Sequence, residues 1–588
     1  MLGKIIEIDE NSVLLELLID TSKLPNLINM YVMIEDEDKL VVGEVINLKK
    51  NIATINLLGQ FVNEKFVIGV INKPSMNSKV KIISKDKIPY IIGLENNGKK
   101  QLYLGTSPVY ENVKMGVSID DFFAHHFAIF GSTGSGKSCA LARILQNLFQ
   151  NNLLIPYRSN IFLFDIYGEH VNAFKDINNI SPNINFKLYT TDLKALKNQI
   201  LRIPPWLLTV DDLALLLNVT KKTQLSVIET ALKLVSIFKE DEEKVLKHKN
   251  HIISKTILDI LTSGKPSVQI RDQIFSILTY YNTKNLNLET EIYQPGYTRP
   301  LKHCLVIDAS GKIREMELLI NFFSQFLNEN LELNLPNDKF MYTLNDLKNA
   351  FDFALISEGT LKSEKIYDEY NSLKIRMETL VKSDYSSYFE YDHYVNKEGF
   401  IKDLIITEEN KKAQIIDFNL NYVDDRFAKS LTKIYSRILF EYSKDLTNRA
   451  SIPIHIVLEE AHRYVQNDND IEILGYNIFE RIAKEGRKYA VILGLISQRP
   501  SEISSTCLSQ CSNFLIFKMI HPNDLDFIKN ALTNISENQI KNIKILPPGV
   551  CMAFGNAFKI PSFIKFEKPN PLPNSGDAQI SNIWFIEK

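Results

Sequence analysis

A glycine-rich segment at residues 131–138 constrains the fold more than any other part of this 588-residue chain. It follows a short apolar run, FAIF at 127–130, and precedes residues with helical spacing that begin at Ser138. Glycine allows backbone conformations that other residues avoid, so this order indicates a buried strand, a tight loop and a helix. The segment therefore predicts an α/β fold with a phosphate-loop core.

The same segment matches the pattern G-x-x-x-x-G-K-[ST], which binds nucleotide phosphates. Its backbone N–H groups and the positive end of the following helix would face phosphate oxygens. We expect Lys137 to reach the β- and γ-phosphates and the Ser138 hydroxyl to hold Mg²⁺. A chance match in a Gly/Ser-rich linker is the alternative, and the flanking strand and helix argue against it. The candidate nucleotide-binding residues are Gly131, Ser132, Thr133, Gly134, Ser135, Gly136, Lys137, Ser138 and Cys139.

A second apolar run, at 161–165, predicts a strand that ends in Asp165, and Glu169 follows four residues later. Ligands in open α/β sheets bind at the carboxyl ends of the strands, so both acids are candidates to face the nucleotide or its metal. The alternative is that Asp165 closes a turn and Glu169 begins a helix.

Two adjacent glutamates follow a third predicted strand, at 454–458. ATP hydrolysis needs one carboxylate near Mg²⁺ and a second that orients or deprotonates the attacking water. We assign Glu459 to the metal and Glu460 to the water. The alternative is a helix whose first turn carries acids that complement its dipole.

A fourth strand, predicted at 491–496, ends in Ser497 and Gln498. Gln498 lies where a polar side chain could hydrogen-bond the γ-phosphate or the attacking water. Four basic residues precede the strand, between 481 and 488, and such a cluster is ordinarily a solvated helix face. Because phosphoryl transfer also needs a guanidinium to neutralise developing charge, Arg487 is the first candidate for an arginine supplied by a neighbouring subunit.

Composition and charge limit the classes of protein to which this chain can belong. The chain has 45% apolar and 23% charged residues and no apolar run near the ~20 residues of a membrane helix. No signal or lipidation motif precedes the first predicted strand, so we expect a cytoplasmic protein without a membrane anchor. A net charge of −2 argues against an outer surface that coats nucleic acid and favours a local contact such as a lined channel. The five cysteines are too few and too scattered for a disulfide framework.

The domain pattern follows from changes in periodicity along the chain. Seven short strand-like runs before residue 85 predict a small β-barrel, with an edge sheet packed on the core as the alternative. Within a helix-rich insertion, the apolar run at 303–309 also resembles a strand. The predicted parts are a barrel at 1–85, a connector at 86–120, the core at 121–189 and 401–565, a mainly helical insertion at 190–400, and a proline-rich tail at 566–588 that either braces a neighbour or is disordered.

Five stretches together resemble the HerA family of the FtsK/HerA group of ring ATPases. Their order and spacing agree with that family over most of the chain. His170 is a departure, because tyrosine commonly follows Gly-Glu at this point in the family. The five are HHFAIFGSTGSGKS at 125–138, FDIYGEH at 164–170, VLEEAHRYV at 457–465, EGRKYAVILGLISQRPSEI at 485–503 and LPPGVCMAFGNAFKIPSF at 546–563.

The resemblance implies a HAS-type β-barrel, of the kind shared with ATP-synthase subunits, a RecA-like P-loop core and a helical insertion. It implies a hexameric ring that hydrolyses ATP with Mg²⁺ to move double-stranded DNA through its pore. It also implies a partner, either a nuclease of the NurA type or a sirtuin-like or nuclease effector of anti-phage defence. By residue, it implies a Walker B pair at Glu459 and Glu460, a sensor at Gln498 and a trans-acting finger at Arg487.

Two other functions compete with a DNA translocase. One is a nucleotide-regulated ring scaffold that assembles and activates an effector, for which the barrel would be the docking module. The other is a secretion or conjugation motor, which the lack of a membrane segment disfavours. A nuclease or deacetylase within this chain is disfavoured because the remaining acids and histidines show no metal-ligand or nucleophile–base spacing.

Overall fold

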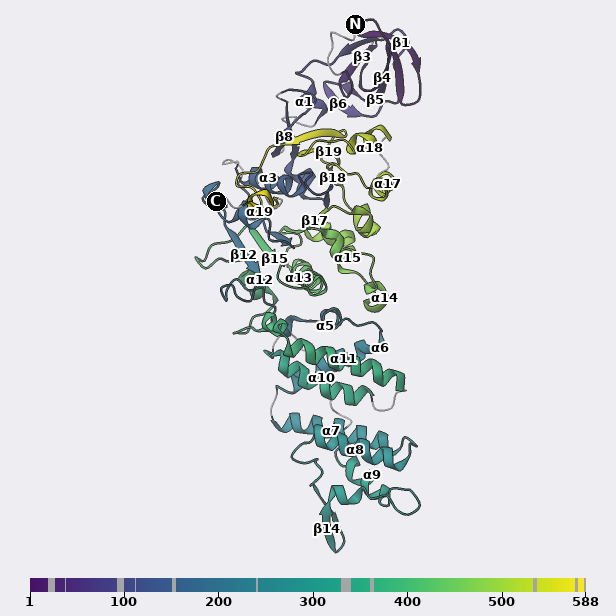
Figure 1. Ribbon diagram of the computed structural model, residues 1–588, viewed down its shortest axis with the longest axis vertical. Coiled ribbons are helices and arrows are strands. Elements are labelled where there is room, and N and C mark those ends of the chain that lie inside the picture. Colours follow the sequence, from purple (N-terminus) through teal and green to yellow (C-terminus); the bar gives the residue numbers. More distant parts are fainter. Residues whose placement is uncertain are drawn as a thin grey trace. The chain divides into compact units, whose positions relative to one another are not determined.

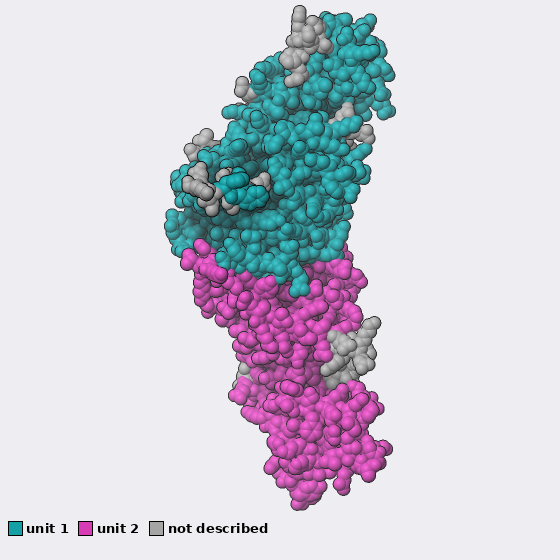
Figure 2. Space-filling view, in the orientation of Figure 1, with its two compact units in different colours: residues 1–192, 403–468, 477–588 teal, residues 193–402, 469–476 magenta. Residues whose placement is uncertain are grey.

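The computed structural model describes residues 1–19, 27–36, 39–92, 100–111, 113–150, 155–239, 242–328, 340–359, 364–531, 537–576 and 580–585. Figure 1 shows the helices and strands of the chain, and Figure 2 colours the two compact units into which it divides. Unit 1 comprises residues 1–192, 403–468 and 477–588, and unit 2 comprises residues 193–402 and 469–476. Within the described ranges, no helix is both long enough and apolar enough to cross a membrane.

Unit 1 begins with an antiparallel sheet in the order β1-β2-β5-β4-β3-β7, with β6 paired to β5. The N–H of Leu2 donates to the carbonyl of Val80 over 2.7 Å, which joins the residues before β1 to β7. Alternating side chains, such as Val13 and Ile55, give this sheet an apolar core of its own. All seven strands lie where the sequence predicted them: β1 (Gly3–Ile8), β2 (Ser12–Leu17), β3 (Tyr31–Asp36), β4 (Lys39–Lys49), β5 (Ile52–Val62), β6 (Lys65–Ile68) and β7 (Lys79–Ile82).

The second sheet of unit 1 has eleven strands within the described residues, in the order β12-β15-β11-β16-β17-β10-β18-β19-β20-β8-β9. The seven strands from β12 to β18 in this order are parallel, and the remaining pairs are antiparallel. Parallel strands bring their carboxyl ends to one edge, so the motifs that follow β10, β11, β16 and β17 meet there. The bounds are β8 (Gln101–Thr106), β9 (Lys114–Ser118), β10 (Phe127–Phe130), β11 (Ile161–Asp165), β12 (Phe186–Thr190), β15 (Ile415–Asn419), β16 (Ile454–Leu458), β17 (Val491–Ser497), β18 (Asn513–Ile516), β19 (Val550–Gly555) and β20 (Ser562–Phe566).

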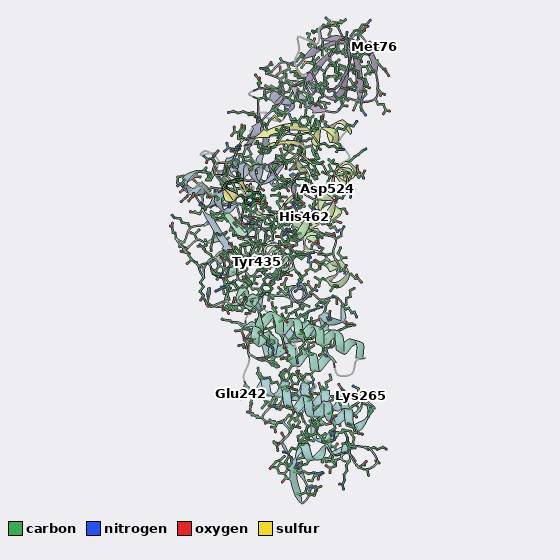
Figure 3. The ribbon with its side chains drawn as sticks, viewed as in Figure 1. Met76, Glu242, Lys265, Tyr435, His462 and Asp524 are labelled. Carbon is green, nitrogen blue, oxygen red and sulfur yellow. The ribbon has the colours of Figure 1, made fainter. Side chains whose placement is uncertain are left out.

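Helices cover this sheet. The longest is α13, which begins after Asp424, whose carboxylate accepts the N–H of Phe427. Its buried Tyr435 (Figure 3) packs on Phe418 of β15, with 4.9 Å between the ring centroids. The helices of unit 1 are α1 (Ile88–Ile91), α2 (Ile119–Phe123), α3 (Lys137–Gln150), α4 (Val171–Phe174), α13 (Asp425–Asp445), α15 (Ile478–Glu485), α16 (Ser505–Ser509), α17 (Pro522–Ala531), α18 (Glu537–Ile543) and α19 (Ile580–Trp584).

Unit 2 is mostly helical. Its first helix has a capping box in which Thr209 and Asp212 each bond the other's backbone N–H. The Trp206 indole N–H donates to the carbonyl of Val395 over 2.7 Å and joins the two ends of this unit. The elements are α5 (Val210–Leu216), α6 (Thr223–Ile237), α7 (Glu242–Leu261), α8 (Ser267–Tyr280), α9 (Met316–Ser324), α10 (Leu344–Gly359), α11 (Glu364–Lys382), α14 (Asp470–Leu474) and the hairpin of β13 (Glu291–Gln294) and β14 (Tyr297–Pro300), while α12 (Lys397–Ile405) spans the boundary with unit 1.

Two sequence expectations differ from the structure. The strand expected at 303–309 is wrong, because residues 301–304 form a 3-10 helix and Ile307 makes only an isolated bridge to Ile313. A short apolar run cannot by itself distinguish a strand from another buried segment. The segment 86–120, expected as a connector, supplies β8 and β9 to the larger sheet.

Candidate nucleotide site

The phosphate loop is anchored to the chain on both sides. The N–H of Ser132 donates to the carbonyl of Lys518 over 2.8 Å, and the N–H of Gly549 donates to the carbonyl of Ser135 over 2.9 Å. Gly136 has a φ of 109°, and a Cβ at this position would lie 3.1 Å from backbone atoms of Gly549. The close approach and the positive φ together require glycine here.

The loop offers polar groups that suit an anion. The Ser135 hydroxyl is buried and has no hydrogen-bond partner among the described residues. Lys137 is also buried, and its ammonium donates to the Ser132 carbonyl over 3.2 Å. Burial lowers the pKa of Lys137, and the facing carboxylates of Glu460 and Glu459 oppose that shift. A glycine loop, a buried ammonium and the start of the 14-residue helix α3 fit a nucleotide polyphosphate.

The structure brings two predicted metal-site residues into contact. The Ser138 hydroxyl donates to Oε1 of Glu459 over 3.1 Å. The half-buried Glu169 carboxylate lies within hydrogen-bonding reach of the same hydroxyl, whose single proton goes to Glu459. Burial raises the pKa of Glu169, and the charge of His170 opposes that shift in part. A hydroxyl flanked by carboxylate oxygens suits Mg²⁺, which prefers oxygen ligands.

Glu460 faces the same site from a strained backbone. Its φ is 47°, an uncommon conformation for a residue with a side chain, and such strain concentrates at functional sites. Nδ1 of His462 (Figure 3) lies 3.2 Å from Oε2 of Glu460 and 3.0 Å from the Ser497 hydroxyl. Burial opposes ionisation of Glu460, but the hydrogen bond with His462 and the charge of Lys137 outweigh it and lower the pKa of the carboxyl group. The side chain is therefore ionised at neutral pH, the form in which a carboxylate can orient the attacking water or accept its proton.

Gln498 contacts the phosphate loop directly. The Thr133 hydroxyl donates to Oε1 of Gln498 over 2.7 Å. Because β17 lies between β10 and β16 in the sheet, Gln498 leaves its strand between the loop and the two glutamates. That Gln498 senses the γ-phosphate stays a prediction.

Asp165 has the turn role that the sequence left open. Its carboxylate is fully buried and accepts the N–H of Tyr167 over 3.2 Å and that of His170 over 2.8 Å. Burial and the neighbouring Glu459 carboxylate raise the pKa of Asp165 to about 6. Both carboxylate oxygens accept N–H groups of the turn, and that Asp165 also faces the nucleotide or its metal stays a prediction.

His170 and Asp417 were not assigned from the sequence. Nε2 of His170 lies 3.2 Å from Oε2 of Glu459, and both side chains are buried. Burial opposes the charge on His170, but the carboxylates of Glu459 and Asp165 raise its pKa to about 10. Asp417 is fully buried without a hydrogen-bond partner among the described residues, and burial raises its pKa well above the usual range. The departure from the family's usual tyrosine was the one sequence signal at His170.

Arg487 is not brought to this site within the chain. It lies in a 3-10 helix, Gly486–Tyr489, that precedes β17, and its side chain is exposed. β17 runs parallel to β10 and places Ser497 beside Phe130 at the loop edge. The six steps along β17 from Val491 to Ser497, at ~3.3 Å each, span roughly 20 Å, and Arg487 precedes this strand.

The chain's last segment packs on the helix of the phosphate loop. The side chain of buried Gln146, on α3, donates to the Pro571 carbonyl over 2.9 Å and accepts the N–H of Asn570 over 2.9 Å. The N–H of Asn574 donates to the Glu169 carbonyl over 2.7 Å. Cys139 is within hydrogen-bonding reach of Ser575, and burial raises the pKa of the thiol. All five cysteines of the chain are free thiols.

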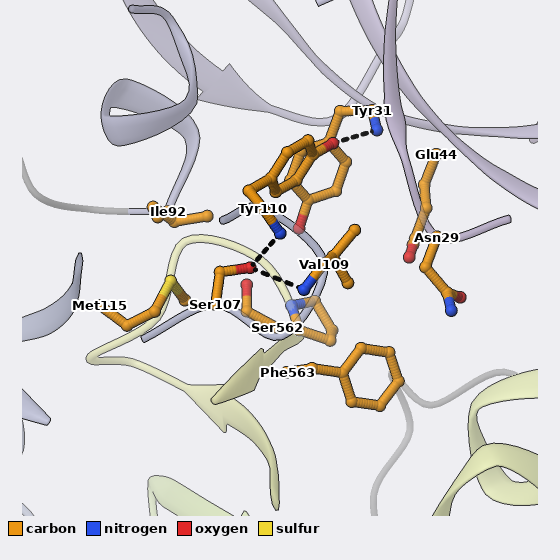
Figure 4. Close-up of a pocket in the computed structure, with 11 residues that line it drawn as sticks. Asn29, Tyr31, Glu44, Ile92, Ser107, Val109, Tyr110, Met115, Ser562 and Phe563 are labelled. Carbon is orange, nitrogen blue, oxygen red and sulfur yellow. Dashed lines mark hydrogen bonds between the residues drawn. The ribbon is translucent and has the colours of Figure 1, made fainter. Parts of the chain in front are cut away.

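A separate small cavity lies at the junction of β3 and β4 with the loops before β9 and β20 (Figure 4). The N–H of Tyr31 donates to the hydroxyl of Tyr110 over 2.5 Å. Burial raises the pKa of Glu44, which also lines the cavity, to about 7. The bond between Tyr31 and Tyr110 joins the first sheet to the second, and none of the predicted site residues lines the cavity.

Comparison with known proteins identifies the family. Residues 102–439, more than half of the chain, match the family model described as "Helicase HerA, central domain". A probable helicase of Methanocaldococcus jannaschii is 31% identical over 193 residues, which cover 33% of this chain and only 34% of that protein. The DNA double-strand break repair helicase HerA of Pyrococcus furiosus is 22% identical over 520 residues, which cover 87% of this chain and 77% of that protein.

The fold also aligns with solved structures. VirB4 of Thermoanaerobacter pseudethanolicus aligns with a TM-score of 0.42 and 13% identity, covering 80% of this chain and 97% of that one. The family match agrees with the motifs quoted from the sequence and with the geometry of the phosphate loop. This chain belongs to the HerA helicase family and is a P-loop ATPase.

Proposed function

We propose that this chain is an ATP-driven motor that moves double-stranded DNA through a ring of six copies. The family match and the name of the Pyrococcus furiosus relative, a DNA double-strand break repair helicase, support DNA as the substrate. A small β-barrel at the start of the chain, a RecA-like core and a helical insertion formed by unit 2 are the architecture that goes with this proposal. ATP is the proposed nucleotide, with Mg²⁺ as its metal.

The residues of the site divide the work of hydrolysis. The loop N–H groups and Lys137 bind the phosphates, and Ser138 with Glu459 holds the metal. When bound, Mg²⁺ neutralises charge that develops on the phosphate oxygens. Glu460 accepts a proton from the attacking water, since His462 and Lys137 keep its carboxylate ionised. Gln498, bonded to Thr133, links the state of the γ-phosphate to the end of β17.

One observation carries the proposal of a ring. Arg487 is exposed at the amino end of β17, while the phosphate loop lies at the carboxyl end of the parallel strands. A guanidinium in this position is suited to reach the pocket of a neighbouring copy and not its own. Each pocket is then complete only between two subunits.

Mixing two inactive variants tests the shared pocket. Lys137→Ala retains Arg487 but has a disabled loop, and Arg487→Ala retains the loop but lacks the arginine. If the arginine acts between subunits, the mixture regains ATP turnover, because Lys137→Ala subunits complete the pockets of Arg487→Ala subunits. A mixture as inactive as its components would contradict the proposal. Lys488→Ala, which removes the adjacent exposed cation, is the matched control and should keep its own activity.

Translocation is tested by displacement of a third DNA strand from a duplex track. We expect ATP-dependent displacement by the wild type and none by Glu460→Gln. A single-stranded track that supports equal movement would favour a conjugation-type motor instead.

A partner nuclease or other effector is part of the proposal. Exposed apolar side chains on β6 and just after it, including Val67, Ile68 and Ile71, offer a surface for docking, and Ile71 is 94% exposed. Native mass measurement after co-expression with a NurA-type nuclease should show a complex that Ile71→Glu weakens. If an effector is activated while DNA is not moved, the nucleotide-regulated scaffold is the better description.

A further inference from the structure

Each oxygen of the Glu459 carboxylate lies close to one polar side chain. Oε1 accepts the Ser138 hydroxyl over 3.1 Å, and Oε2 lies 3.2 Å from Nε2 of His170. The backbone N–H of Glu459 donates to the Phe164 carbonyl over 3.1 Å, which fixes where the side chain starts. Among the described residues, His170 is the one basic side chain paired with this glutamate.

His170 is itself fixed by the turn that follows β11. Its N–H donates to the Asp165 carboxylate over 2.8 Å, and its ring stacks on Phe174, with centroids 6.1 Å apart. Gly168 has a φ of 68°, and a Cβ there would lie 2.5 Å from the side chain of Asn419. The imidazole is fully buried, so its position is set by the protein and not by solvent.

A glutamate at this position needs such support. It has one more methylene group than aspartate, and each extra rotatable bond must be ordered before the carboxylate can act. One contact, from Ser138, leaves the carboxylate free to rotate about that bond. A second contact at the other oxygen fixes the plane of the group.

We propose that His170 is a positioning residue that orients Glu459, through contact with Oε2, so that Oε1 faces Ser138 at the start of α3. The proposal rests on the ATPase part of the proposed function and is independent of DNA movement. His170 would contact a residue that in turn contacts the metal. Replacing such a supporting residue commonly lowers activity or metal affinity by about 10- to 100-fold.

Three substitutions separate orientation from burial. His170→Phe keeps the ring packed on Phe174 but removes the nitrogen that faces Glu459. His170→Gln has an amide N–H at about the reach of Nε2, whereas His170→Asn has the same amide group one methylene shorter. His455→Gln is the control, because His455 is a buried histidine at the opposite end of the same strand as Glu459 and bonds the Phe123 carbonyl.

Steady-state ATP turnover without DNA is the first readout. We expect His170→Phe to lower kcat by about 10- to 100-fold with KM within about threefold, and His170→Gln to recover most of the loss. His170→Asn should resemble His170→Phe, and His455→Gln should resemble the wild type. Equal kcat for His170→Phe and the wild type, or equal loss in the Gln and Asn variants, would overturn the proposal.

Binding of fluorescent ADP at varied Mg²⁺ is the second readout and does not depend on turnover. The Mg²⁺ concentration for half-maximal binding should rise about tenfold in His170→Asn and stay near wild type in His170→Gln. An unchanged Mg²⁺ requirement would overturn the proposal. If His170→Phe fails to fold, the Gln and Asn pair decides alone. A wild type that binds Mg²⁺-ADP but never hydrolyses ATP would defeat the proposed function while leaving this test intact.

Discussion

His126 makes the stability of the phosphate-loop strand dependent on pH. The residue precedes β10 and is 1% exposed. Its Nδ1 accepts the N–H of Leu493 on β17 over 2.8 Å, and its Nε2 donates to the carbonyl of Ala483 over 3.0 Å. An acceptor at Nδ1 requires the neutral ring, so protonation must break the bond to Leu493.

The size of the effect follows from the pKa. Burial, with a smaller effect from the charge of Arg487, lowers the pKa of His126 from 6.5 to about 4. Between these values the unfolded chain binds a proton that the folded chain does not, so the free energy of unfolding falls as pH falls. The shift of about 2.5 units corresponds to about 3 kcal/mol, at 1.36 kcal/mol per unit. This contribution is complete above pH 6.5 and lost towards pH 4.

Hydrogen exchange of residues 491–497, measured by mass spectrometry between pH 4.5 and 7.5 and corrected for intrinsic rates, reports this opening directly. We expect protection of the wild type to fall with acid by up to about 1.4 kcal/mol per pH unit. His126→Gln should lack that dependence, because glutamine does not titrate. The exposed His303→Gln is the control and should behave as the wild type. The same acid dependence in His126→Gln would show that protonation of His126 is not its cause.

Three further predictions concern packing around the site. Gly136→Ala forces a side chain against Gly549 at positive φ. We expect nucleotide affinity, measured by fluorescence titration, to fall at least about fivefold, as about 1–3 kcal/mol of strain implies. Gly576→Ala, which lies in open space, should leave the affinity unchanged. Gln146→Leu removes two hydrogen bonds to residues 570–571, worth about 1 kcal/mol each, so limited proteolysis of this segment should be roughly 30-fold faster. The exposed Gln510→Leu is the control. Unchanged cleavage in Gln146→Leu would contradict the contacts. Burial raises the pKa of Asp417, so its carboxyl group should be uncharged at pH 7. The free energy of unfolding of Asp417→Asn, measured by thermal unfolding at pH 7, should therefore differ from that of the wild type by less than about 1 kcal/mol. A larger loss would mean that the carboxylate is charged.

Much of the parallel sheet was predictable from short apolar runs bounded by glycine and acidic residues. The strands at 127–130, 161–165 and 454–458 were predicted with the bounds that the structure has. Because each run ends in a polar motif, the rule that ligands bind at the carboxyl ends of parallel strands already placed the motifs together. The contact between Ser138 and Glu459 across an intervening strand follows from that rule.

Other contacts have no local sequence signal. The bond pattern of Asp165 depends on the turn geometry of residues 166–170, and the approach of His170 to Glu459 depends on how two strands pair. Residues 469–476 belong to unit 2 although they are far from it in sequence. The final segment lies along α3 through backbone groups, which periodicity does not reveal.

We propose that ATP hydrolysis at the phosphate loop is coupled to duplex DNA. Its most direct test is ATP turnover by the full chain with and without linear duplex DNA, for the wild type and for Glu460→Gln. We expect stimulation of the wild type by DNA and a loss of at least about 100-fold in Glu460→Gln in both conditions, because a general base is removed. Turnover that is indifferent to duplex DNA, or that persists in Glu460→Gln, would contradict it.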